Sequence, residues 1–213
     1  MSKFQIGAKP GHQAQEHLFV LKSIMRLYKL LNIPIYATFW DISAFFDCQS
    51  LQDVLLAINQ AGVQGKPLRL LYNLNKNTKI KVSTPLGLTK CAKTGENTGQ
   101  GNLSSAVASS LHLDIGIQTY FHSSTYHLSY GKVKVSPMGY QDNALTLATS
   151  HRGAVDNSRF ELLMKSRQLD VNIDKLALLP IASKKISDGI HEELEASPIL
   201  YDNSQIKVKQ SEK

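Results

Sequence analysis

The feature that most constrains the fold of this chain is a pair of short acidic motifs, each of which follows β-forming residues. The first run, residues 35–40, is followed directly by Asp41. The second run, residues 132–135, lies shortly before the Tyr-Gln-Asp-Asn motif at 140–143. Aspartates that a sheet brings side by side can hold the divalent cations used by phosphoryl-transfer enzymes. The two motifs therefore predict neighbouring strands with an acidic site at their ends.

Composition places the chain among globular proteins and narrows its partners. With 213 residues and 42% hydrophobic content, it is long enough for one core. A net charge of +7 permits a polyanionic partner without demonstrating one. Cys48 and Cys91 are the two cysteines and form no CxxC pair, which argues against a disulfide scaffold or a structural zinc site. Since no apolar run spans a membrane and no signal peptide is evident, we expect an intracellular protein of the cytoplasm or nucleus, with no membrane partner.

Apolar spacing and turn residues predict an ordered series of helices and strands. In the first half we expect a helix over 12–31, a strand over 35–40, a helix capped by Ser50, a helix whose first residue is Pro67, and a hairpin over 79–93. In the second half we expect a Gly-rich turn over 95–101 and then a helix that carries the apolar residues of 103–113. A loop over 120–131, a hairpin with 141–143 at its tip, a helix over 156–168 and a strand over 176–181 should follow. The last thirty residues are weakly patterned. This order predicts an α+β fold around a small antiparallel sheet packed against helices.

Taken in order, the motifs resemble the palm region of a reverse transcriptase of the non-LTR (LINE-like) retrotransposon type. The acidic segments 39–47 and 140–143 are similar to the family's first acidic motif and to its Tyr-Ala-Asp-Asp box. Residues 99–105 resemble its Arg-Gln-Gly-Asp-Pro-Leu-Ser-Pro motif, and residues 169–175 resemble the segment that ends Asn-x-x-Lys. Residues 5–18, with Gln-x-Gly and Pro-Gly, are similar to the stretch before the palm.

The resemblance implies RNA-templated DNA synthesis with an RNA template, a DNA primer and deoxynucleoside triphosphates. It implies two Mg²⁺ ions, or Mn²⁺ in their place, held by Asp41, the backbone carbonyl of Ile42, Asp142 and Asn143. Asp41 and Asp142 would be catalytic, together with Lys175, which would neutralise or protonate the departing pyrophosphate.

The resemblance also implies a nucleotide site. The ring of Phe46 would exclude a ribose 2′-hydroxyl and so favour deoxynucleotides. Gln100 and Gly101 would lie beneath the incoming nucleotide, where a glycine lets the backbone approach closely.

As a domain plan, the resemblance assigns residues 1–34 to partial fingers and a connecting helix, and residues 35–181 to the palm. Residues 182–213 would be a C-terminal remnant leading towards a primer grip and thumb that we expect to be absent.

The sequence also departs from the family pattern at charged positions. Asn143 stands where the box has its second aspartate, Gly99 where arginine is usual, and Ala44 where lysine is common. One unit charge about 4 Å from a divalent ion is worth several kcal/mol at an effective dielectric of about 20. We therefore expect a truncated and degenerate reverse-transcriptase domain. Two alternatives stay open: a nucleic-acid-binding module without catalysis, and an inert remnant of a retroelement.

Overall fold

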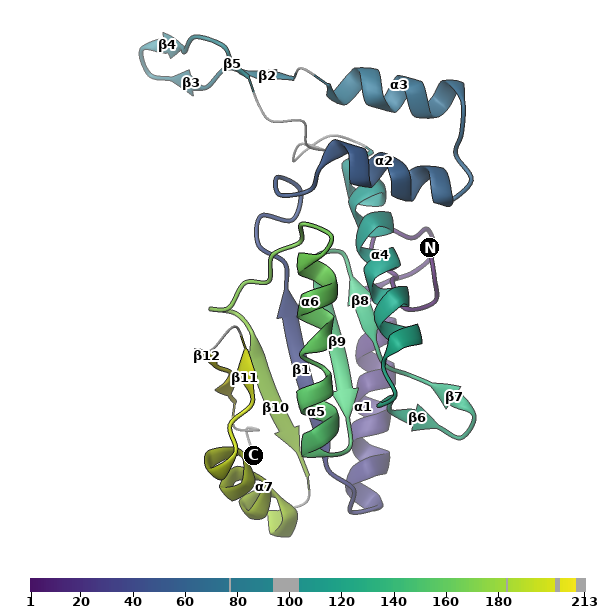
Figure 1. Cartoon of the computed structure of the whole chain (residues 1–213), viewed down its shortest axis with the longest axis vertical. Helices are drawn as coiled ribbons and strands as arrows, with labels where there is room; N and C mark the ends of the chain where they lie inside the picture. Colours follow the sequence, from purple (N-terminus) through teal and green to yellow (C-terminus); the bar gives the residue numbers. More distant parts are fainter. Residues whose placement is uncertain (77, 94–103, 183, 202–203, 210–213) are drawn as a thin grey trace.

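A five-stranded sheet forms the centre of the molecule, with helices on both faces (Figure 1). The computed structural model describes residues 1–76, 78–93, 104–182, 184–201 and 204–209. The strand order is β13-β10-β1-β9-β8. The predicted α+β fold with a small sheet packed against helices is confirmed at this level.

The strand that carries the first acidic motif lies in the middle of the sheet. β1 (Ile35–Asp41) pairs antiparallel with β10 (Ala177–Ile181) on one side and with β9 (Asn143–Ala148) on the other. β9 forms a hairpin with the edge strand β8 (Met138–Tyr140). The prediction of a purely antiparallel sheet is wrong at the opposite edge, where β13 (Lys207–Val208) runs parallel to β10.

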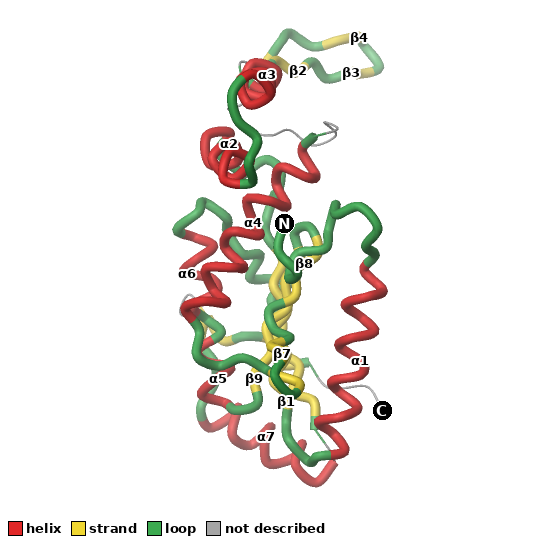
Figure 2. Tube along the Cα trace, turned by 90° about the vertical axis from the view of Figure 1, so that its right-hand side faces the viewer, coloured by secondary structure: helices red, strands yellow, loops and turns green. Residues whose placement is uncertain are grey.

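Alternating residues of β1 build two cores on opposite faces of the sheet. Ile35 and Ala37 pack with helix α1 (Ala14–Leu30), whereas Tyr36 and Trp40 face the other way. That second face is covered by α4 (Ser105–Ser123), α5 (His151–Asp156) and α6 (Arg159–Lys165). Figure 2 shows the sheet edge-on between α1 and these helices. A strand buried on both faces reads as a nearly continuous apolar run, as residues 35–40 do.

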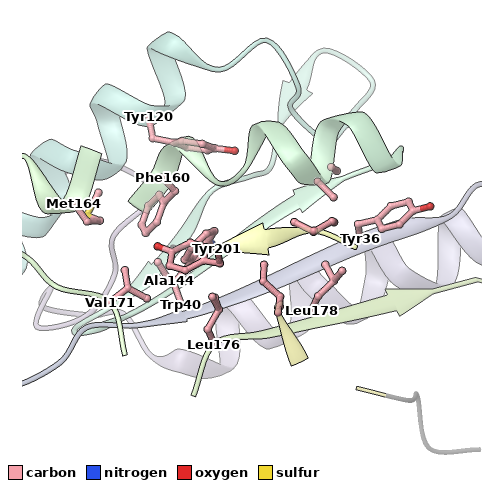
Figure 3. Close-up of a cluster of buried hydrophobic side chains, with 14 of the residues drawn as sticks. Tyr36, Trp40, Tyr120, Ala144, Phe160, Met164, Val171, Leu176, Leu178 and Tyr201 are labelled. Atoms are coloured by element: carbon pink, nitrogen blue, oxygen red, sulfur yellow. The ribbon is translucent and has the colours of Figure 1, made fainter. Parts of the chain in front are cut away.

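Trp40 is the centre of the larger core (Figure 3). Its ring lies 5.1 Å from the ring of Phe160 and 5.3 Å from that of Tyr201, measured between centroids. Its indole N–H donates to the hydroxyl of Thr146 across the β1–β9 pair at 2.8 Å. A buried indole needs such a partner, and this bond fixes the face of β1 that turns towards α6.

Two helices and two small hairpin ladders extend from one end of this body (Figure 1). The helices are α2 (Leu51–Gln60) and α3 (Lys66–Asn75), and α2 packs on α4 through Val54, Ile58 and Ala108. The ladders pair β2 (Lys79–Ile80) with β5 (Ala92–Lys93) and β3 (Ser83–Thr84) with β4 (Gly87–Leu88). The predicted helices and the hairpin over 79–93 are confirmed, with Pro67 at the second rather than the first helical position.

The region 120–135 differs from the sequence-based expectation. α4 continues to Ser123 because Tyr120 is completely buried and packs against Phe160 of α6, so the predicted loop begins later. β6 (Ser129–Tyr130) then pairs with β7 (Val133–Lys134) in a separate hairpin. The run 132–135 is therefore not the first strand of the acidic hairpin, which is β8 instead.

Two further helical regions differ from the expectation. The helix predicted over 156–168 is present as the shorter α6, and α5 is a separate helix before it. Asn157 lies between the two, and its buried side chain accepts a hydrogen bond from the Tyr120 hydroxyl. The weakly patterned end contains α7 (Lys184–Ala196), followed by β11 (Leu200–Tyr201) and β12 (Ser204–Gln205). Ile190 and Leu194 of α7 lie in the larger core. Within the described residues, no helix is both long and apolar enough to cross a membrane.

Candidate polymerase-type acidic site

Sheet register brings the two acidic motifs together. Asp41 is the last residue of β1, and its Cα partner across the β1–β9 pair is Asn143. Tyr140 pairs with Asn143 in the β8–β9 hairpin, so Gln141 and Asp142 form a two-residue turn. Asp142 therefore lies beside the end of β1, and its backbone carbonyl accepts from the Ile42 N–H at 3.1 Å.

The acidic turn is held by a buried glutamine from the N-terminal segment. Gln141 has a φ of 53°, a left-handed conformation that a residue other than glycine rarely adopts. The fully buried Gln5 side chain accepts from the Gln141 N–H at 3.2 Å and donates to the Gln141 carbonyl at 3.1 Å. It also accepts from the Gly7 N–H at 2.8 Å. A Cβ at Gly7 would lie 2.1 Å from the Gln141 nitrogen, so this close approach requires glycine.

Residues just after β1 add a second backbone anchor. The Ser43 N–H donates to the Asp170 carbonyl at 2.8 Å, and the Asn172 N–H donates to the Asp41 carbonyl at 2.8 Å. Because backbone groups alternate in direction along an extended strand, the N–H and carbonyl of Ile42 face the opposite side, towards Asp142. The Ile42 carbonyl therefore lies on the same side of the strand as Asp142, where the resemblance to reverse transcriptases implies a metal ligand.

Lys175 reaches the first aspartate from the loop before β10. Its ammonium lies 3.2 Å from Oδ1 and 3.1 Å from Oδ2 of Asp41. Asn172 shapes this loop: its side-chain oxygen accepts from the Asp174 N–H, and its carbonyl accepts from the Lys175 and Leu176 N–H groups. The Asp41 side chain is 15% exposed and that of Lys175 is 64% exposed, so the pair lies at the rim of the site.

The oxygen atoms of this site suit a hard cation. They carry less negative charge than three carboxylates would. The Asn143 side-chain N–H donates to Asp142 Oδ1 at 2.9 Å. Asn143 therefore offers a cation its neutral amide oxygen in place of a carboxylate. In the part of the chain that the structure describes, no three His, Cys, Asp or Glu side chains gather as a potential metal site. Two carboxylates, the Ile42 carbonyl and the Asn143 amide oxygen remain as oxygen ligands of the kind that Mg²⁺ prefers.

The residues expected to contact a nucleotide are placed less completely. Phe46 lies in the turn after β1, half-buried, with its ring 5.3 Å from that of Phe45 in an edge-to-face arrangement. Gln100 and Gly101 lie outside the described residues. Asp41, Ile42, Asp142, Asn143 and Lys175 are thus brought together, and Phe46 follows on the same loop.

A groove of about 430 Å³ adjoins the acidic turn, and its lining includes lysine side chains that were not predicted from the sequence. Asp41, Asn143 and Lys175 line it, together with Lys207 and Lys209. The Lys207 ammonium also donates to the Asp174 carbonyl at 3.2 Å. The Lys-Val-Lys alternation, which places both lysines on one face of a strand, was the available signal. The groove therefore sets three ammonium groups beside the carboxylates.

The fold, in which the acidic turn joins the edge strand β8 to β9 beside the end of β1, is similar to that of reverse transcriptases. Solved structures of telomerase, which is a reverse transcriptase, are similar to this chain. Apo telomerase of Candida tropicalis, truncated from its C-terminal domain, matches with a TM-score of 0.58 and 10% identity over 83% of this chain and 36% of that one. Telomerase of Candida albicans, in complex with a fragment of telomeric RNA, matches with a TM-score of 0.59 and 12% identity over 78% of this chain and 30% of that one.

These matches concern the fold. The chain spans about a third of the length of the telomerases that it resembles. No protein-family model and no curated protein sequence matches it.

Proposed function

We propose that this chain is the palm of a non-LTR-type reverse transcriptase, with residues 35–181 as the palm and residues 1–34 as part of the fingers. The protein to which this palm belongs would carry out RNA-templated DNA synthesis. The observation that carries the proposal is the register of β1 and β9, which pairs Asp41 with Asn143 and sets Asp142 beside them. The similarity to telomerase folds supports a reverse-transcriptase-like fold, which is the coarser part of this assignment.

In this proposal the acidic turn binds divalent cations. Bound Mg²⁺ would lower the pKa of the primer 3′-hydroxyl and stabilise charge on the attacking and leaving oxygens. Asp41 and Asp142 would supply anionic ligands, while the Ile42 carbonyl and the Asn143 amide oxygen would supply neutral ones. Lys175 would leave Asp41 and turn to the phosphate groups of the nucleotide, since its exposed side chain is free to rotate between two anions.

Cation binding tests the site directly. In a titration with Mn²⁺ followed by paramagnetic broadening of backbone amide NMR signals, we expect broadening around residues 41–43 and 141–143. Asp41→Asn and Asp142→Asn should each abolish it. Asn143→Asp adds a unit charge and should tighten binding by about tenfold or more. Asp188→Asn, an exposed carboxylate on α7, is the matched control and should change nothing.

Primer extension tests the polymerase assignment. With an RNA template, a DNA primer and Mg²⁺ or Mn²⁺, we expect slow extension by the wild-type chain and faster extension by Asn143→Asp. Phe46→Ala should raise the incorporation of ribonucleotides relative to deoxynucleotides. Cation binding without extension by either the wild type or Asn143→Asp would contradict the polymerase assignment and leave the cation site standing.

A nucleic-acid-binding palm without catalysis is the second candidate, and one observation favours it. Lys175 and the Asn143 amide contact the carboxylates of Asp41 and Asp142, while Lys207 and Lys209 line the groove. This candidate predicts salt-dependent RNA binding that Asp41→Ala leaves unchanged and that Lys207→Ala with Lys209→Ala weakens. RNA binding that needs both Asp41 and a divalent cation would favour the polymerase instead.

A further inference from the structure

Another hollow lies between α1 and the β6–β7 hairpin. Figure 1 shows this hairpin projecting beside α1. The groove has a volume of about 350 Å³. Its walls are apolar, with one from the helix and one from the hairpin: Phe19, Ile24, Leu27, Tyr130, Val133 and Val135.

The groove is preformed because hydrogen bonds and core packing fix its two walls to each other. The Tyr28 hydroxyl on α1 donates to the Ser129 carbonyl at the start of the hairpin, at 2.8 Å. The Val135 N–H donates to the Leu128 carbonyl at 2.9 Å, and Leu128 is buried in the core beneath α1. A partner would therefore bind without ordering the groove, which lowers the entropic cost of association.

The apolar side chains at the mouth of the groove are exposed. Phe19 is 73% exposed, Tyr130 62% and Val133 57%. Exposed apolar side chains gathered around one groove mark an interaction site more often than isolated apolar residues do.

The charge around the groove is of one sign. Lys22, Arg26 and Lys29 are exposed on α1 and, at 3.6 residues per turn, follow the solvent side of the stripe that begins at Phe19. Lys132 is exposed at the turn of the hairpin, whereas Lys134 faces away, over the ring of Phe121. Residues 17–31 and 125–137 contain no aspartate or glutamate. The rim therefore attracts acidic groups.

We propose that this groove binds an acidic amphipathic helix of a partner protein. Phe19 to Leu27 spans about 12 Å along α1, just over two helical turns, which suits a helix with apolar anchors at i, i+3, i+4 and i+7. Acidic residues beside those anchors would meet Lys22, Arg26 and Lys132. The cationic rim disfavours a second copy of this chain, because like charges would face each other. Ile24, Leu27, Val133 and Val135 are aliphatic and suit leucine-type anchors, whereas an oligonucleotide would have to stack its bases on Phe19 and Tyr130.

The test uses a labelled helical peptide with leucines at this spacing and glutamates beside them. A second peptide with the same leucines and lysines in place of the glutamates is its control. We expect the glutamate peptide to bind and to shift the NMR signals of residues 19–27 and 130–135, and the lysine peptide to bind at least about tenfold more weakly.

Two matched variants place the interaction on the groove. Phe19→Glu should weaken the binding of the glutamate peptide by about tenfold or more, because it removes an aromatic anchor from the groove and adds a charge that repels the glutamates. Leu162→Glu, at a 64% exposed position on α6, is its matched control and should leave binding unchanged. Equal binding of both peptides, or signal shifts elsewhere, would overturn the proposal.

Two other outcomes would assign the groove to a different occupant and would also overturn it. The first is oligouridine binding that Phe19→Glu abolishes while neither peptide binds. The second is a concentration-dependent dimer in sedimentation that Phe19→Glu dissociates.

Discussion

Gln5 is the residue on which the local geometry of the acidic turn depends most. Its side chain joins the N-terminal segment to both backbone groups of Gln141, the residue that adopts the left-handed conformation. A non-glycine residue in that conformation costs on the order of 1 kcal/mol or more. The turn keeps Asp142 beside Asp41 because these hydrogen bonds offset that cost.

Replacing Gln5 should therefore loosen the site as well as the fold. Gln5→Ala leaves the buried N–H groups of Gly7 and Gln141 without their acceptor, and we expect a loss of about 2 kcal/mol or more in the free energy of unfolding. Gln5→Glu keeps the acceptor and loses the donor, so a smaller loss is expected. Urea unfolding measures both changes, and the Asp142 amide NMR signal reports the order of the turn.

Gln60→Ala, at an exposed position at the end of α2, is the matched control for Gln5→Ala and should be nearly neutral. Equal stability of Gln5→Ala and Gln60→Ala would show that the turn is held by other contacts.

At the scale of elements, the sequence predicted what local pattern encodes and failed where packing decides. The apolar run 35–40 and the spacing within 12–31 gave β1 and α1 correctly, because burial of these elements leaves a periodic mark. The extension of α4 to Ser123 depends on Tyr120, which packs against distant α6, and the polar residues around it hide that contact. α7 has Ile186, Ile190 and Leu194 at intervals of four, but its charged composition and Gly189 weaken the helical signal.

The same limit applies to the acidic site. Asp41, Asp142 and Lys175 could be named from their motifs, and the structure brings them together. Gln5 and Gly7 belong to the Gln-x-Gly stretch that resembles the segment before the palm, but the sequence did not predict that the Gln5 side chain is buried and holds the acidic turn. Lys207 and Lys209 reach the groove through a parallel strand pairing between segments about thirty residues apart, which sequence periodicity does not reveal.

The C-terminal elements should contribute strongly to stability, despite their weak sequence pattern. Tyr201 of β11 is 2% exposed and lies against Trp40, whereas its neighbour Leu200 is 56% exposed. Tyr201→Ala opens a cavity beside Trp40 and should cost about 3 kcal/mol or more of unfolding free energy. Leu200→Ala should cost less than about 0.5 kcal/mol. Denaturant unfolding followed by Trp40 fluorescence measures both, and equal costs would show that β11 does not close the core.

At the scale of the whole molecule, α4 joins the sheet body to the layer formed by α2 and α3. His112 lies at this junction, completely buried, with its Nδ1 3.3 Å from Oε1 of Gln49. Burial, assisted by the nearby Arg167 guanidinium, lowers the pKa of His112 to about 4. Burial also lowers the pKa of His17 and of His127. The folded chain therefore holds these rings neutral at a pH where the unfolded chain protonates them.

Stability should consequently depend on pH between about 6.5 and 4. Above the unfolded histidine pKa of about 6.5 both states are neutral and His112 imposes no cost. As the pH falls, the unfolded state binds a proton that folded His112 does not, so the free energy of unfolding decreases until the pH reaches the folded pKa of about 4. The loss from this residue approaches about 3 kcal/mol. Urea unfolding at a series of pH values measures it.

His112→Gln separates this effect from the titration of carboxylates, which the variant and the wild type share. Glutamine does not take up a proton, so the difference in unfolding free energy between His112→Gln and the wild type should shift in favour of the variant as the pH falls from about 6.5 to 4. A His112→Gln difference that stays constant over this range would mean that His112 takes up its proton in the folded chain, and that the junction between α4 and α2 admits a charge.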